Sequence, residues 1–289
     1  MRIVAAAIQM PSDLLKLDSN LERADLLLKE AYKSGADLAA LPEMFNTGYG
    51  LISDYTPMGE TLDGPTLTHI RERCRAWKMT IAAGFVERCG RHLYDSLALC
   101  TPDGETHVYR KRHLVFWERF RFRPGKGSQV AKTPFGRVGL AVCADMIYRR
   151  VWNDYRNKID VALVAAAWPD FANRHTGRPH WLMGHIGPLS AEIPAKVAAD
   201  LGVPVIFANQ CGSTHTTIPL VGMWLAERLP DRFAGSSTVV DGKLGTRVTA
   251  GAREELVLSE ITIPSSRGPI ACHSMYPLVP AATSSGSAA

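Results

Sequence analysis

Short apolar runs alternate along the chain with stretches whose leucines and other apolar residues repeat at helical spacing. A short apolar run that ends at a turn residue is typical of a buried strand, and apolar residues three or four apart are typical of an amphipathic helix. Strands that alternate with helices indicate an α/β domain whose helices cover the faces of the sheets. The predicted strands are 3–8, 37–41, 81–86, 96–100, 107–109, 138–143, 161–166 and 203–208, and the predicted helices are 21–32, 65–77, 150–157 and 191–201.

Turn residues between some of these strands predict mixed sheets rather than purely parallel ones. A Pro-Asp-Gly turn at 102–104 lies between two strands and predicts a hairpin. The closing strands 237–240 and 256–263, around an Asp-Gly pair at 241–242, are predicted to be antiparallel.

No linker rich in proline, glycine or serine interrupts this pattern, so a single domain is expected over residues 1–289. Its core is expected at about 1–264, and a C-terminal extension at 265–289. Hydrophobic residues make up 46% of the chain and charged residues 21%, which is an ordinary globular balance.

Charge and cysteine usage exclude several classes of protein. The formal net charge is only +5, which does not by itself indicate nucleic-acid binding. The six cysteines are scattered, with no Cys-x-x-Cys pair, so neither a secreted disulfide scaffold nor a zinc ribbon is expected. The N-terminus shows no signal-peptide pattern, and no apolar run reaches the roughly 18 residues of a membrane span. A reducing cytoplasm is the expected location, with no membrane partner.

Three chemically capable side chains follow predicted strands. Glu43 follows the strand 37–41, Lys111 follows 107–109, and Cys143 ends 138–143. Ligands of α/β folds bind at strand ends, because the loops there converge. Taken singly, Cys143 is explained by core packing, Glu43 by helix capping and Lys111 by a solvated face. The sequence segments around the three residues therefore decide the interpretation.

Those settings resemble the nitrilase superfamily of carbon–nitrogen hydrolases. The segment 41–49 (Leu-Pro-Glu-Met-Phe-Asn-Thr-Gly-Tyr) resembles that family's glutamate block, 109–114 (Tyr-Arg-Lys-Arg-His-Leu) its lysine block, and 139–145 (Gly-Leu-Ala-Val-Cys-Ala-Asp) its nucleophile block. Weaker similarities extend over nearly the whole chain and lie at Glu118 with the following Phe122, Pro124 and Gly125, at His180-Trp181, at 205–212 and at Gly235-Ser236-Ser237.

The resemblance implies a fold and an assembly. The fold is expected to be an α-β-β-α sandwich of two mixed sheets with helices on the outer faces. Each chain is expected to contribute an α/β sandwich of two sheets, and the four layers to be complete once two chains pack together. Relatives of this kind are homo-oligomers, dimers or larger, and the stretch 264–280 is a candidate for crossing to the partner.

The resemblance also implies a mechanism without metal or organic cofactor. Cys143 is the expected nucleophile, Glu43 the general base, and Lys111 the cation that lowers the pKa of the thiol and then binds the oxyanion. The backbone N–H of Ala144 is expected to bind the oxyanion as well. Glu118 is expected to hydrogen-bond near Lys111 or the substrate amine.

The substrate is expected to be a small amide or an N-carbamoyl compound. Asp145, two residues after Cys143, is more common in the amidase and carbamoyl branches of the family than in true nitrilases. Nitrile hydrolysis and acyl transfer to an amine remain alternatives for the same three residues. By position, the candidates for the pocket are Phe45, Tyr49, Trp117, Ala144 and Trp168.

Departures from the family pattern concern the substrate more than the chemistry. The helix 196–201 reads Lys-Val-Ala-Ala-Asp-Leu, where relatives carry an Arg-Ala-x-Glu-Asn-like stretch. The segment 213–232 is longer than usual, and Ala144 stands where many relatives place an aromatic residue.

Two other interpretations of the sequence are less well supported. His175, His180 and His185 are spaced by five residues, which suits neither a helical pair of zinc ligands nor another familiar zinc pattern. The segment 110–126 mixes seven lysines and arginines with aromatic residues, which is compatible with nucleic-acid binding. Glu118 lies within it and no RNA-binding motif is present, so an enzyme is favoured over a binding module.

Overall fold

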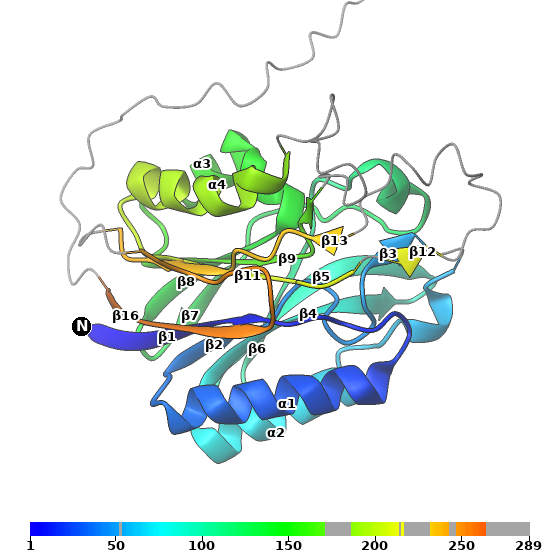
Figure 1. Cartoon of the computed structure of the whole chain (residues 1–289), viewed down its shortest axis with the longest axis horizontal. Coiled ribbons are helices and arrows are strands. Elements are labelled where there is room, and N and C mark those ends of the chain that lie inside the picture. The colour runs from blue at the N-terminus through cyan, green and yellow to red at the C-terminus, as the bar shows by residue number, and fades with distance from the viewer. Residues whose placement is uncertain (52–53, 171–185, 214, 217–231, 243–246, 264–289) are drawn as a thin grey trace, which may run out of the picture.

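The structure is a computed structural model, and it describes residues 1–51, 54–170, 186–213, 215–216, 232–242 and 247–263. Two six-stranded sheets pack face to face in the described part of the chain, with helices on both outer faces (Figure 1). None of the helices described is long and apolar enough to cross a membrane.

The first sheet has parallel strands at its centre and antiparallel strands towards its edges. Its order is β16 (Glu255–Thr262), β1 (Arg2–Gln9), β2 (Leu38–Ala40), β4 (Thr80–Cys89), β5 (His92–Cys100) and β6 (Thr106–Arg110).

The second sheet repeats this design, with a parallel centre and antiparallel flanks. Its order is β15 (Arg247–Thr249), β14 (Thr238–Val240), β11 (Val205–Asn209), β9 (Val161–Ala166), β8 (Gly136–Val142) and β7 (Val130–Thr133). Two short pairs stand apart from both sheets: β3 (Gly50–Leu51) with β12 (His215–Thr216), and β10 (Pro169–Asp170) with β13 (Arg232–Phe233).

The helices cover the outer faces (Figure 1). α1 (Leu17–Lys33) and α2 (Pro65–Trp77) pack against the first sheet through a cluster that includes Leu28, Ile70 and Cys74. α3 (Arg149–Tyr155) and α4 (Ile186–Leu201) pack against the second sheet. Three 3₁₀ turns complete the described elements: η1 (Thr56–Met58), η2 (Phe116–Phe120) and η3 (Cys143–Ile147).

The largest core cluster includes apolar residues between the two sheets. Leu97 and Leu99 of β5 contribute from one sheet, and Leu140 and Leu163 from the other. Burial of the apolar faces of both sheets is the dominant favourable term for such a sandwich. It also fixes how the strand ends of one sheet lie against those of the other.

The expected α-β-β-α sandwich of two mixed sheets is confirmed, with one correction. All four layers lie within one chain, so the expectation that two chains complete them is wrong. The closing strands are antiparallel to their neighbours, as predicted, and they lie in different sheets: β14 pairs with β11 and β15 in the second sheet, and β16 pairs with β1 in the first.

The predicted hairpin between β5 and β6 is present, and a second one joins β4 to β5 across Gly90-Arg91. The second hairpin lengthens both of the strands predicted at 81–86 and 96–100. Gly90 has a φ of +59°, a backbone conformation that glycine adopts without steric cost. This tight turn went unrecognised because polar residues dominate the outer ends of both strands.

Candidate active site

The predicted strand ends meet at one edge of the sandwich. Glu43 lies just beyond β2, Lys111 directly follows β6, and Cys143 directly follows β8. Glu43 and Lys111 therefore come from the first sheet and Cys143 from the second. Glu43 and Lys111 are fully buried, and Cys143 is 5% exposed. The structure thus brings together the three residues expected to carry the chemistry.

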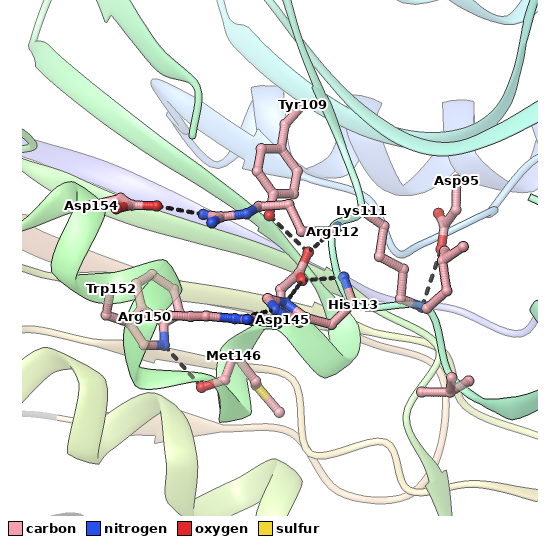
Figure 2. A network of polar contacts seen from close by, with 12 residues as sticks. Asp95, Tyr109, Lys111, Arg112, His113, Asp145, Met146, Arg150, Trp152 and Asp154 are labelled. Carbon is pink, nitrogen blue, oxygen red and sulfur yellow. Dashed lines mark hydrogen bonds and ion pairs between the residues drawn. The ribbon is translucent and has the colours of Figure 1, made fainter. Parts of the chain in front are cut away.

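The ammonium of Lys111 lies among three buried carboxylates. Its Nζ donates to Glu43 Oε1 at 2.6 Å and to Glu118 Oε1 at 2.7 Å. Asp95 Oδ2 lies 3.2 Å from the same nitrogen, and Figure 2 shows Asp95 reaching Lys111 from β5. Desolvation opposes the charge of Lys111, but Glu118, Glu43 and the other neighbours outweigh it and raise the pKa of the amine well above its usual value. Lys111 is held as a cation.

Glu43 is fixed from three sides. Besides Lys111, its carboxylate accepts the Ala167 N–H at 2.6 Å, and its backbone carbonyl accepts Gln210 Nε2 at 2.8 Å. A Cβ at Gly84 of β4 would lie only 2.6 Å from the Cα of Glu43, so this loop rests directly on the strand. The carboxylate is presented on a backbone with little freedom to shift.

Glu118 is held by three donors. Besides Lys111, Tyr49 donates its hydroxyl to Glu118 Oε1 at 2.7 Å, and the Val115 N–H donates to Oε2 at 2.8 Å. The contact predicted between Glu118 and Lys111 is present. Burial nevertheless raises the pKa of Glu118, a shift that Lys111 opposes.

Cys143 has a strained backbone and a shielded thiol. Its φ is +46°, a conformation that costs a non-glycine residue on the order of 1–3 kcal/mol and is typical of functional sites. Desolvation and the charge of Glu43 raise the pKa of the thiol well above its usual value, although Lys111 acts in the opposite direction. The expected influence of Lys111 is therefore present but outweighed, and in the resting site the thiol keeps its proton.

Asp145 connects the nucleophile turn to the lysine loop (Figure 2). Its carboxylate accepts the Tyr109 hydroxyl at 2.8 Å and the backbone N–H groups of Arg112 and His113 at 3.1 and 2.9 Å. His113 Nδ1 lies 2.6 Å from Asp145 Oδ1, and Arg150 Nε donates to His113 Nε2 at 2.7 Å. Because Nε2 accepts, Nδ1 carries the proton that reaches Asp145.

The predicted pocket residues divide into different settings. Tyr49 and Trp117 lie edge to face, with ring centroids 5.1 Å apart, next to Glu118. Trp168 is 3% exposed, and its indole N–H donates to the Ile186 carbonyl. Phe45, in contrast, is fully buried in the core cluster between the first sheet and its helices. Ala144 is 5% exposed, beside Cys143.

Sequence reasoning missed Asp95 and the Ala167 N–H. Asp95 shares one face of β5 with Leu97 and Leu99, because alternate residues of a strand point the same way. An acid in line with two core leucines was a readable signal. The Ala167 N–H could not be read, since every residue except proline carries the same group.

The carboxylates of Glu43, Asp95 and Glu118 have oxygens within 4.8 Å of one another, as ligands of a metal ion would. The Lys111 ammonium already lies 2.6–3.2 Å from all three, in the place of a cation. His175, His180 and His185, and the His180-Trp181 similarity, lie outside the described residues, as do nearly all of 213–232 and the stretch 264–280.

Comparison with known proteins gives consistent matches. The profile of the family described as carbon–nitrogen hydrolase matches residues 4–268. An omega-amidase of Xenopus laevis is 34% identical over 82% of this chain and 87% of its own. A nitrilase of Pyrococcus abyssi is 36% identical over 50% of this chain, which spans little more than half, 57%, of that relative. The bovine omega-amidase is 32% identical over 61% of this chain and 66% of its own.

Solved structures share the fold. A carbon–nitrogen hydrolase from Helicobacter pylori superposes with a TM-score of 0.75 at 23% identity and covers 90% of this chain and 89% of its own. A CN-hydrolase superfamily protein from Xanthomonas campestris superposes with a TM-score of 0.73 at 22% identity, with 91% of both chains covered. At such identities the likeness concerns the fold alone.

Proposed function

The chain belongs to the carbon–nitrogen hydrolase family, and from this membership we propose that it hydrolyses the carbon–nitrogen bond of a small amide through a thioester on Cys143. The observation that carries the proposal is the buried Lys111 ammonium, bonded to Glu43 and Glu118 at the strand ends where Cys143 lies. A nucleophile, a base and an oxyanion-binding cation are what amide hydrolysis at neutral pH needs.

In the first half-reaction Glu43 accepts the thiol proton while the sulfur attacks the carbonyl carbon. The high pKa of the buried thiol favours this coupled transfer over a preformed thiolate. The electron pair of the C=O bond moves to oxygen, where Lys111 and the Ala144 N–H stabilise it, each donor contributing about 3 kcal/mol. The intermediate collapses, the C–N bond breaks, and the amine leaves with the proton held by Glu43.

In the second half-reaction Glu43 deprotonates a water molecule that attacks the thioester. A second tetrahedral intermediate expels the sulfur, which regains a proton from Glu43, and the acid is released. Glu118, tied to Lys111 and Tyr49, keeps the ammonium aligned through both half-reactions. Every proton is transferred through side chains of this protein, so the proposed cycle requires no metal or organic cofactor.

The proposed substrate is a small amide or N-carbamoyl compound. The omega-amidases among the relatives support an amide. The Pyrococcus nitrilase keeps nitrile hydrolysis as the second candidate. Acyl transfer differs only in the acceptor, because an amine in place of water would attack the same thioester.

We further propose one domain over 1–289 that assembles into a homo-oligomer and acts in the cytoplasm. Light scattering coupled to size exclusion would give the mass of the assembly. A monomer at micromolar concentration would contradict the oligomer and leave the chemistry intact.

The test of function is ammonia release from a panel of amides, N-carbamoyl compounds and nitriles. Cys143→Ala is expected to abolish release, whereas Cys89→Ala, a change at an exposed cysteine, is expected to retain it. Intact-mass spectrometry of the wild type with its best substrate should show the added mass of one acyl group, and Cys143→Ala should lack it. Full activity of Cys143→Ala would overturn the mechanism, and preferred turnover of a nitrile would overturn the substrate class.

A further inference from the structure

Asp95 is a buried acid beside the candidate active site. It lies on β5, on the face that carries Leu97 and Leu99 into the layer between the two sheets, and it is 1% exposed. A charge buried in such a place is costly unless hydrogen bonds and opposite charges compensate it.

The contacts of Asp95 differ from those of the two glutamates beside it. Glu118 accepts three hydrogen bonds and the Glu43 carboxylate accepts two. Asp95 has one donor nearby, the Lys111 ammonium at 3.2 Å, which is farther away than either glutamate oxygen. Within the described residues, no backbone N–H or hydroxyl group donates to its buried oxygens. Each of the two glutamates has the hydrogen-bond donors that stabilise an ionised carboxylate, whereas Asp95 has too few.

The balance of charges around Lys111 also indicates that one carboxyl group is protonated. Three carboxylates from three segments face one ammonium, so the cluster would carry a net charge of −2 if all of them were ionised. Carboxylates that share a buried site do not all ionise, because one of them keeps a proton. Among the three, Asp95 is the one with the fewest donors.

We propose that Asp95 is a neutral carboxylic acid that donates its proton to Glu43 and so positions the pair of Glu43 and Lys111. Burial, then the charge of Glu43 and a side-chain hydrogen bond with it, raise the pKa of Asp95 well above its usual value, while Lys111 acts in the opposite sense. The carboxyl oxygens of Asp95 and Glu43 lie within 4.8 Å of each other, and a hydrogen bond between two carboxyl groups requires a proton on one of them.

The role of Asp95 as a positioning residue rests on the proposed function, but its protonation does not. With Asp95 neutral, Lys111 balances two anions instead of three, and more of its positive charge remains for a developing oxyanion. An asparagine at 95 would reproduce a neutral side chain with one donor and one acceptor. A glutamine at 118 would instead remove a negative charge.

The first test measures the rate of alkylation of Cys143 by iodoacetamide against pH in the wild type, Asp95→Asn and Glu118→Gln. Removing the charge of Glu118, which raises the pKa of the thiol, should lower that pKa and speed alkylation severalfold at a fixed pH near neutrality. Asp95→Asn should alkylate within about twofold of the wild type, because no charge is removed. A severalfold acceleration by Asp95→Asn would show that Asp95 is an anion and overturn the proposal.

The second test needs no variant. Infrared spectra of the wild type with the aspartate side-chain carboxyl carbon labelled with ¹³C should show a carboxylic-acid C=O band that shifts on labelling at neutral pH. Absence of such a band would overturn the proposal. Neither measurement depends on turnover of a substrate, so both would still report the protonation state of Asp95 if the proposed hydrolysis were wrong.

Discussion

Replacing Asp95 with asparagine should change how the stability of the protein depends on pH. An aspartate keeps its proton in the folded protein if burial raises its pKa, as burial and Glu43 do here, and loses it on unfolding, where its pKa is about 3.9. The stability contributed by such a group is fully present below the unfolded pKa and is lost as the pH rises through the folded pKa. Asparagine has no proton to release.

The magnitude follows from proton linkage. Between the two pKa values, unfolding of the wild type releases one proton more than unfolding of Asp95→Asn, so their free energies of unfolding diverge by about 1.4 kcal/mol per pH unit. From pH 5.5 to pH 7.5, if the folded pKa lies above that range, the variant should gain about 2.7 kcal/mol over the wild type. All other titrating groups are common to both proteins and cancel to first order.

Urea unfolding at three pH values across this range, at one fixed chain concentration, measures the difference. Asp103→Asn is the matched control, because Asp103 is on the surface with a lowered pKa and is ionised in both states at these pH values. Its difference from the wild type should not vary with pH. A difference that is equally flat for Asp95→Asn would refute the reasoning, since Asp95 would then be ionised in the folded protein.

Three further outcomes are expected. Tyr155→Phe should cost about 1–3 kcal/mol in urea unfolding, because it leaves the buried Leu140 carbonyl and the partly buried Gln129 N–H without their hydroxyl partner. Alkylation of Cys143 should keep its wild-type rate. Asp145→Asn should lower kcat on the best amide by on the order of 10²-fold with little change in KM, because the turn that carries Cys143 shifts. A wild-type kcat would show that Asp145 does not position this turn. Lys111→Met should destabilise the fold by about 3–5 kcal/mol, as buried carboxylates lose their cation, and unchanged thermal unfolding would contradict this.

Much of the fold could be read from the sequence because its strands are short apolar runs bounded by turn residues. Pairing was harder to read. The strand 256–263 has the same appearance whether it pairs with 237–240 or with β1, because periodicity reports which face is buried and not which neighbour is hydrogen-bonded. The second hairpin depended on a tight turn at Gly90 that carries only a weak signal.

The candidate site also has a part that the local sequence predicts and a part that depends on the tertiary structure. Glu43, Lys111 and Cys143 stand out because each follows a predicted strand and lies within a block that resembles the family's pattern. Asp95 lies in a strand and reads as one more polar residue until its leucine neighbours show which way it points. The proton on it depends on three other segments that converge in space, and no local pattern reports that.

The pairing of β1 with β16 affects how the protein can fold during synthesis. All eight residues of β1 pair with β16, from Arg2 with Thr262 to Gln9 with Glu255. At ribosomal speeds of about 5–20 residues per second, β1 is made roughly 13–50 s before its neighbour. Throughout that interval one side of an apolar strand offers unpaired N–H and C=O groups to any other nascent chain, which is the geometry that leads to aggregation. Ribosome-associated chaperones that cover the first strand should therefore raise the yield of this protein more than that of a chain whose sheet closes early.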